Sequence, residues 1–298
     1  MMFDNPQDKK LSGGKYAMFF DIDGTLVSFK THQIPASAIL ALTQAKANGH
    51  KVFIATGRPP LIITNLGAIE HLIDGYVTIN GALCFVGDEV VRCKDIPKQD
   101  VLTLVRDAQE KNYGVIVVGE KDVAVLDPQG EVDRIFRVEI AVENLHLAKP
   151  LDEVLSQRIL QLTPFFPESY EAELMSRLPG CTSGRWHPAF TDITAKGADK
   201  GEGILTLSAR LGLDARYTMA FGDGGNDTSM IKAAGIGVAM GNALESLKRE
   251  APIPLPPSTM TASSMPCVIS ASYSCCRLRI SFYFSCLIRK SATISVER

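Results

Sequence analysis

The stretch YAMFFDIDGT, residues 16–25, decides the fold of this chain. Residues 16–20 are all apolar or aromatic, and the run stops at Asp21. An unbroken run of this length is typical of a strand buried on both faces, as in a parallel sheet. Gly24 breaks the pattern, so we expect a buried strand that carries Asp21 and Asp23 at its carboxyl end.

Strands and helices alternate on both sides of a long middle segment. We expect further strands at 51–55, 75–79, 217–221 and 236–240, and helices over 35–49, 60–70, 201–211, 226–234 and 243–250. Such alternation predicts a parallel sheet with helices on its faces. The fold class that we predict is therefore α/β, with a Rossmann-like, doubly wound parallel sheet as its core.

The middle segment follows a different pattern. Residues 82–93 look like a hairpin that turns at Gly87. After it we expect helices near 97–112, 131–141 and 167–178, and strands near 115–119, 122–126, 159–163, 181–186 and 190–194. Hairpins mixed with helices indicate an α+β module. We therefore expect a discontinuous core, residues 16–83 and 189–251, that hosts an inserted α+β cap, residues 84–188. Residues 1–15 are expected to form a flexible N-terminal extension.

The composition is that of an ordinary globular protein. Hydrophobic residues make up 46% and charged residues 21%, and the net charge is −2. This balance gives no basic field for nucleic acid or anionic lipid, and no apolar run approaches the roughly 18 residues of a membrane helix. The first 15 residues do not resemble a signal peptide, so we expect a cytoplasmic protein. The cysteines form no paired Cys-x-x-Cys framework, and those in the body are expected to be small core residues.

Polar residues follow four of the expected strands directly. They are Asp21 with Asp23, Thr56, Asn80 and Asp223. Parallel strands bring their carboxyl ends to one edge of the sheet, which is where open α/β sheets bind ligands. We therefore expect these side chains to meet in one site.

Asp21 and Asp23 suit covalent phosphoryl transfer. One carboxylate attacks, and its neighbour protonates the leaving oxygen and later activates water. The alternative is a plain Asp-Gly turn. Mg²⁺ prefers oxygen ligands, which Asp21, the backbone carbonyl of Asp23, and Asp223 could supply. Asp227 would bind through water or orient the ligands.

Three further motifs could bind the phosphoryl group. Thr56 offers a hydroxyl and Gly57 a close backbone approach, although an ordinary strand-to-helix loop is equally compatible. Lys200 offers a positive charge, although Lys196 and Lys200 could each be part of a solvated helix start. The segment GDGGND could be a glycine turn that places Asn226 as a helix N-cap, and such a helix N-terminus is itself an anion site.

Together these motifs resemble the haloacid dehalogenase superfamily, in its Cof-like branch with a large α/β cap. They are DIDGT (21–25), ATGRP (55–59), KGADKG (196–201) and FGDGGND (221–227). The segments LTPFF (162–166) and GRWHPAFTDITAKG (184–197) are similar to sugar-phosphate phosphatases of Bacteroides-type bacteria.

The resemblance implies a role for each matching residue. Asp21 would form the aspartyl phosphate, and Asp23 would be the general acid and base. Thr56 and Lys200 would hold the phosphoryl group, Asn226 would touch it or the substrate, and Asn80 would line the pocket. Asp223 would bind Mg²⁺ with help from Asp227. The cap would select the leaving group; Arg185, Trp186 and His187 are candidates for this, although cap packing is the interpretation that we favour for them.

The expected function is Mg²⁺-dependent hydrolysis of small phosphate monoesters, above all sugar phosphates. Alternatives are a phosphatase of a flavin precursor or of pyridoxal phosphate, a phosphomutase, a non-catalytic phosphate binder, or an unstable product. The expected partner is a small phosphorylated metabolite, without nucleic acid or membrane, and the chain is expected to be a monomer or weak dimer.

The tail, residues 252–298, departs from the family pattern. Four prolines crowd its start and argue against a helix or strand there. Read in a shifted frame, the codons that could encode it permit ADxVT and then DDGIxHALRHFGII before a stop, which is similar to the family's usual ending. We therefore expect a frameshift near codon 251 and a disordered tail; the alternative is a genuine divergent tail, and resequencing of the locus would distinguish the two.

Overall fold

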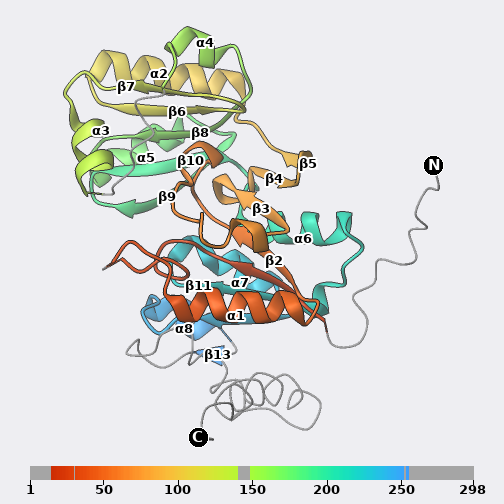
Figure 1. Ribbon diagram of the computed structural model, residues 1–298. Coiled ribbons are helices and arrows are strands. Elements are labelled where there is room, and N and C mark those ends of the chain that lie inside the picture. The colour runs from red at the N-terminus through yellow and green to blue at the C-terminus, as the bar shows by residue number, and fades with distance from the viewer. Residues whose placement is uncertain (1–14, 30, 140–147, 252, 255–298) are drawn as a thin grey trace, which may run out of the picture.

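The computed structural model describes residues 15–29, 31–139, 148–251 and 253–254, and these form two sheets (Figure 1). The first is eight-stranded. Its strands, in spatial order, are β13 (Ile253–Pro254), β12 (Ile236–Ala239), β11 (Thr218–Gly222), β1 (Ala17–Phe20), β2 (Lys51–Ala55), β3 (Gly75–Thr78), β4 (Leu83–Val86) and β5 (Glu89–Cys93). Pairing is parallel from β13 to β3 and antiparallel from β3 to β5.

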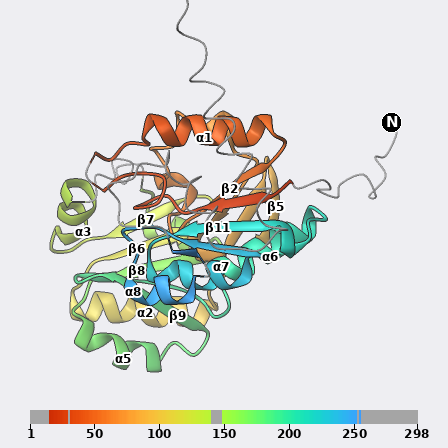
Figure 2. The same ribbon diagram turned by 90° about the horizontal axis from the view of Figure 1, so that it is seen from below.

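Strand β1 lies in the middle of this sheet because both of its faces are apolar. Met18 and Phe20 pack in a cluster with α1 (Ala36–Ala47), while Ala17 and Phe19 pack toward the other helices. These other helices are α6 (Lys200–Arg210), α7 (Thr228–Ala233) and α8 (Glu245–Glu250). Figure 2 shows α1 on one face and α6, α7 and α8 on the other. The predicted doubly wound α/β core is confirmed.

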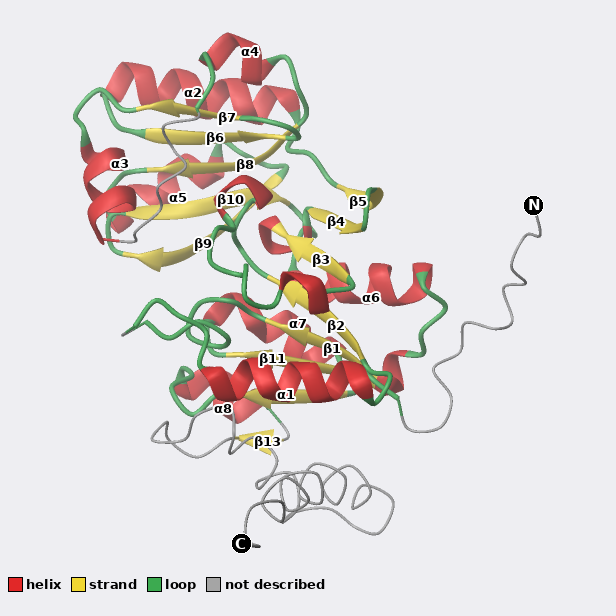
Figure 3. Cartoon of the chain, viewed as in Figure 1, coloured by secondary structure: helices red, strands yellow, loops and turns green. Residues whose placement is uncertain are grey.

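The second sheet is five-stranded and antiparallel. Its order is β7 (Val123–Leu126), β6 (Val115–Gly119), β8 (Ile159–Pro164), β10 (Phe190–Ala195) and β9 (Cys181–His187). Helices α2 (Lys98–Lys111) and α5 (Glu168–Ser176) pack on one face (Figure 3). The opposite face packs with α3 (Glu131–Asp133), the π-helical turn Arg134–Glu139 and residues of the first sheet such as Leu83.

The pairing of the strands differs from the expected cap boundaries at both ends. The hairpin β4–β5 was expected mostly in the cap, but it extends the first sheet beside β3. Strand β10 was expected with the core, which was to resume at residue 189, but it pairs with β8 and β9 in the second sheet. An antiparallel hairpin carries the same local sequence signals whichever sheet it joins, so the sequence could not decide this.

Three local features also differ from what the sequence predicted. No continuous helix forms over 60–70 in the described chain; two 3₁₀ turns, Pro60–Ile62 and Glu70–Leu72, flank an irregular segment. The helix α4 (Leu151–Leu155) was not expected. Strand β13 forms despite its proline, because an edge strand tolerates a missing N–H. The other expected tail features and the N-terminal extension, apart from residue 15, lie outside the described residues.

No helix in the described part of the chain is both long enough and apolar enough to cross a membrane.

Candidate active site

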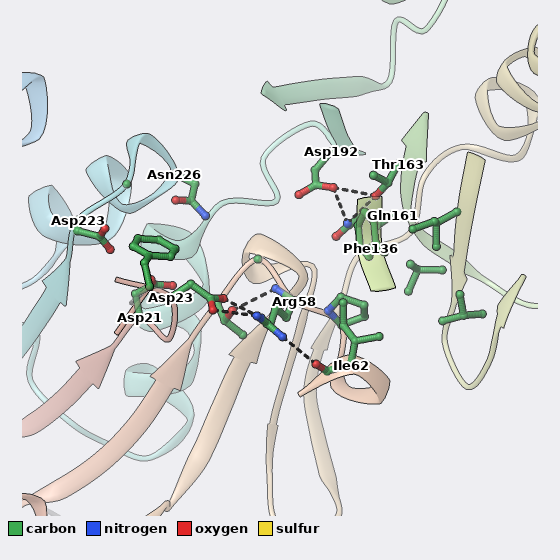
Figure 4. A pocket seen from close by; sticks show the side chains of 18 of the residues that line it. Asp21, Asp23, Arg58, Ile62, Phe136, Gln161, Thr163, Asp192, Asp223 and Asn226 are labelled. Carbon is green, nitrogen blue, oxygen red and sulfur yellow. Dashed lines mark hydrogen bonds and ion pairs between the residues drawn. The ribbon is translucent and has the colours of Figure 1, made fainter. Parts of the chain in front are cut away.

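The site lies where β1, β2 and β11 end. Asp21 follows β1 directly, and its backbone N–H donates to the carbonyl of Phe221 on β11. Thr56 follows β2, and Asp223 follows β11. Because these strands are parallel neighbours in register, the three side chains come to one edge of the sheet. Figure 4 shows Asp21, Asp23 and Asp223 close together there.

Lys200 is buried between two carboxylates. Its Nζ lies 2.7 Å from Oδ1 of Asp21 and 2.5 Å from Oδ1 of Asp227, and the side chain is 0% exposed. Burial by itself would lower the pKa of Lys200, but the two carboxylates raise it above its usual value. Lys200 is thus an internal cation, whereas Lys196 is exposed. The alternative of a solvated helix start is therefore wrong for Lys200.

Asp227 has both carboxylate oxygens in use. Oδ2 accepts hydrogen bonds from the backbone N–H groups of Asp223 and Gly224, each at 2.8 Å, while Oδ1 contacts Lys200. The side chain therefore fixes the turn after β11 and orients Lys200. This geometry favours an orienting role over direct metal binding.

Asp223 is held by two side chains that the sequence analysis did not single out. The hydroxyl of Thr25 donates to its Oδ1 at 3.1 Å, and the amide of Asn242 donates to its Oδ2 at 3.0 Å. Burial and the nearby charge of Asp227 raise the pKa of Asp223 to about 7. Asn242 comes from the loop after β12, and no sequence motif indicated it.

The carboxylates form a donor set that fits a hard divalent cation. Asp21 and Asp223 each offer an oxygen, and these atoms lie within 4.8 Å of each other and of an oxygen of Asp227, which orients the group. Burial raises the pKa of Asp21 as well; Lys200 lowers it, and Asp227 and Asp223 raise it further. Crowded buried carboxylates carry more negative charge than Lys200 alone neutralises, and a bound cation would relieve that repulsion.

Asp23 forms a bidentate ion pair with Arg58. Nε and Nη2 of Arg58 donate to the two oxygens of Asp23 at 2.7 and 2.8 Å, and Nη1 donates to the carbonyl of Ile62 at 3.1 Å (Figure 4). A bidentate pair of this kind fixes the orientation of a carboxylate. Arg58 belongs to a motif quoted above, yet nothing in its sequence position shows which carboxylate it meets.

The predicted phosphoryl-binding residues lie around Thr56. Its hydroxyl accepts the N–H of Arg58 at 3.1 Å. Gly57 gives space to two amides, because a Cβ there would lie 3.2 Å from Asn80 and 3.4 Å from Asn226. The Asn226 amide donates to Oδ1 of Asn80 at 3.0 Å. Thr56, Gly57 and Asn226 line the pocket, whereas Asn80 supports Asn226 from behind.

A single cavity of about 340 Å³ joins this edge to the second sheet. Its floor is lined by Asp21, Asp23, Thr56, Gly57, Arg58, Asp223 and Asn226. Phe29 and His32, from the loop after β1, also line it, and its other wall consists of Ile116, Val118, Val123, Phe136, Gln161, Thr163 and Asp192. The size is within the usual range for a small-molecule site, about 300–1,000 Å³.

The cap residues considered for specificity lie elsewhere. Arg185 pairs with Glu171 at 2.6 Å and also donates to the carbonyl of Pro188. The ring of His187 stacks on Phe190. Neither side chain lines the cavity, which supports packing roles for both. The side chain of Trp186 lies outside the described parts of the structure.

Known proteins resemble this chain over most of its length. The family model for haloacid dehalogenase-like hydrolases matches residues 18–259. The Bacillus subtilis protein YkrA is 32% identical over 235 residues, which is 78% of this chain and 88% of that protein.

Two solved structures share the architecture. One is a sugar phosphatase of haloacid dehalogenase subclass IIB; it is 44% identical, with a TM-score of 0.74, and the match covers 82% of this chain and 94% of that one. The other is a phosphatase from Bacteroides thetaiotaomicron; it is 31% identical, also with a TM-score of 0.74, over 94% of this chain and 97% of that one.

Proposed function

This chain belongs to the haloacid dehalogenase-like hydrolases, and from that premise we propose that it is a Mg²⁺-dependent phosphatase with Asp21 as nucleophile. It is a phosphoric monoester hydrolase, as are the phosphatases to which it is similar. The observation that carries the proposal is the position of Asp21. This carboxylate lines the cavity while Lys200 holds its Oδ1 from behind.

The ion pair with Lys200 orients the nucleophile. Because Oδ1 of Asp21 is bound to Nζ, Oδ2 is the oxygen that we assign to attack on phosphorus. In the first step a bond forms from Asp21 to phosphorus, and the bond from phosphorus to the leaving oxygen breaks. In the second step water attacks the aspartyl phosphate and releases inorganic phosphate and free Asp21.

Asp23 is the group placed to move the protons. It lies two residues beyond Asp21 and lines the same cavity. It would protonate the leaving oxygen in the first step and take a proton from water in the second. Arg58 contacts both oxygens of Asp23 and so fixes the orientation of this carboxylate in the lining of the cavity.

The transferred group carries negative charge that the site must stabilise. Mg²⁺, held by Asp21 and Asp223, would supply this by its own charge. Thr56, Gly57 and Asn226 line the cavity as hydrogen-bonding groups for the phosphoryl oxygens. Lys200 is fully buried behind Asp21, so we infer that its charge acts through the Asp21 carboxylate.

Sugar phosphates are the substrates that we propose. The cavity continues from the carboxylates to the second sheet, which leaves room for a leaving group of modest size. Support comes also from the similarity, at 44% identity, to a sugar phosphatase.

Phosphate release from a panel of phosphate esters tests the proposal. Wild type should release phosphate with Mg²⁺, lose that activity with a chelator and recover it when Mg²⁺ returns. Asp21→Asn should abolish release, and the exposed control Asp88→Asn should not change it. Acid-quenched wild type should carry a phosphoryl adduct that mass spectrometry detects, and Asp21→Asn should not. Undiminished turnover by Asp21→Asn would refute the nucleophile assignment.

A further inference from the structure

Three polar side chains are buried in the wall of the cavity opposite the catalytic carboxylates. Gln161 and Thr163 lie two apart on β8 and therefore share a face, and Asp192 lies on the neighbouring strand β10. They are only 4%, 1% and 8% exposed. Figure 4 shows them clustered across the cavity from Asp21 and Asp223. The neighbouring strands β6 and β7 contribute the apolar side chains Ile116, Val118 and Val123 to the same wall, so packing alone does not require a polar cluster there.

The hydrogen bonds fix the orientation of the Gln161 amide. Its nitrogen donates to Oδ1 of Asp192 at 2.9 Å and to the hydroxyl oxygen of Thr163 at 3.0 Å. The Thr163 hydroxyl in turn donates to the same Asp192 oxygen at 2.7 Å. A flipped amide would set its oxygen against the carboxylate, so the nitrogen must face Asp192.

This network leaves one strong acceptor unused. Oε1 of Gln161 is buried and has no hydrogen-bond partner among the described residues. Buried polar atoms are nearly always paired with protein or water, so an unpaired one calls for a physical explanation. Because Gln161 lines the cavity, a donor on a bound molecule is the natural partner of this oxygen.

The surroundings restrict which donor this is. Neither lysine nor arginine belongs to the described residues that line the second-sheet wall, and Asp192 adds a carboxylate there. A second phosphate or a carboxylate on the substrate would meet no cation at this end and would be repelled. The apolar side chains Ile116, Val118 and Phe136 offer contact to the carbon skeleton instead.

We propose that Gln161, oriented by Thr163 and Asp192, accepts a hydrogen bond from a hydroxyl group of a neutral, polyhydroxylated leaving group. The proposal rests on the phosphatase function above and adds the residues that select its substrate. Gln161 is the specificity residue that touches substrate, and Thr163 and Asp192 are positioning residues. Substrates with a second anionic group at the far end are excluded.

Paired substrates test this assignment. The kcat/KM of wild type and of Gln161→Met is measured for a hexose phosphate, for its deoxy analogues that each lack one hydroxyl, and for para-nitrophenyl phosphate. Gln161→Met should lower kcat/KM for the hexose phosphate by about tenfold to a hundredfold, because a buried hydroxyl loses its partner. It should leave para-nitrophenyl phosphate unaffected. Gln157→Met, a cap glutamine outside the cavity, is the matched control.

The deoxy series keeps the test valid if the variant folds poorly. In wild type, one deoxy analogue should show the same loss as the variant, and in Gln161→Met that analogue should lose nothing further. Equal rates for all deoxy analogues in wild type, or an equal loss on para-nitrophenyl phosphate in the variant, would overturn the assignment while the phosphatase function stands. Absence of any turnover in wild type would overturn both.

Discussion

Replacing Lys200 with methionine should destabilise this protein far more than the loss of one surface lysine. The substitution keeps about the same side-chain length and removes the charge together with the hydrogen bonds to Asp21 and Asp227. In the structure that charge lies 2.7 Å from Asp21 and 2.5 Å from Asp227, and the three side chains are 0%, 10% and 0% exposed. Both carboxylates would remain buried without their cation.

The expected cost follows from that burial. Removing one partner of a buried ion pair typically costs about 3–5 kcal/mol, because the remaining charge stays buried and unpaired. Two carboxylates share Lys200, so we expect a loss in the upper part of this range. Typical stabilities are about 5–15 kcal/mol, so the variant should lose a large fraction of its free energy of unfolding.

Urea denaturation with a chelator present measures this loss, since a bound cation could replace the lysine charge. The unfolding midpoint should fall by about 1–3 M for typical denaturant slopes. Lys196→Met, an exposed lysine of the same motif, should change it little. Adding Asp227→Asn to Lys200→Met should recover part of the loss, because one orphaned charge is gone. If Lys200→Met unfolds at the same urea concentration as Lys196→Met, the description of Lys200 as a buried cation is wrong.

Two further predictions concern the charged pairs of the core. Arg58→Lys should lower kcat by about tenfold with little change in thermal stability, because an ammonium cannot hold both oxygens of Asp23. Steady-state kinetics and a thermal melting curve measure the two effects, and an unchanged kcat would contradict the prediction. Burial would raise the pKa of Asp74, but hydrogen bonds from Lys46, the backbone N–H of Val52 and Lys51 outweigh it and lower that pKa. A lowered folded-state pKa gives stability that is present above the unfolded-state pKa and is lost as the pH falls through the folded-state value. The free energy of unfolding of wild type should therefore exceed that of Asp74→Asn by about 1 kcal/mol near neutral pH, and the difference should shrink below about pH 4. Denaturation curves recorded at several pH values measure this, and a difference that does not change with pH would contradict it.

Most of the catalytic edge could be predicted because it depends on local sequence. Unbroken apolar runs predict buried parallel strands, and parallel strands place Asp21, Thr56 and Asp223 at one edge whatever else the fold does. Lys200 was a candidate because of its charge, and the resemblance to a known family supported it, but no local pattern indicates its burial. The roles of these residues in catalysis stay predictions, which the Asp21→Asn experiment addresses.

The cap boundaries could not be predicted for a physical reason. Hairpin β4–β5 and strand β10 have strand signals that are independent of the sheet they join. Which partner they find depends on contacts between residues far apart in the chain, such as Arg92 with Thr206 or Asp192 with Thr163. Short apolar segments such as 60–70 are likewise decided by packing rather than by propensity.

The sequence by itself thus determined the doubly wound core and the carboxylates at its edge, because periodicity and strand order are encoded locally. Only the tertiary structure decided which polar side chains contact one another. Arg58 reaches Asp23, Asn242 reaches Asp223, and Gln161 turns its amide toward Asp192 because each pair is brought together by chain segments that are distant in sequence. A side chain's hydrogen-bonding capacity can be read from its identity, but its partner is set by the geometry of the folded chain. The pair Asp21 and Asp23, which belongs to the stretch YAMFFDIDGT, therefore acquires its orientation from residues that this stretch does not contain.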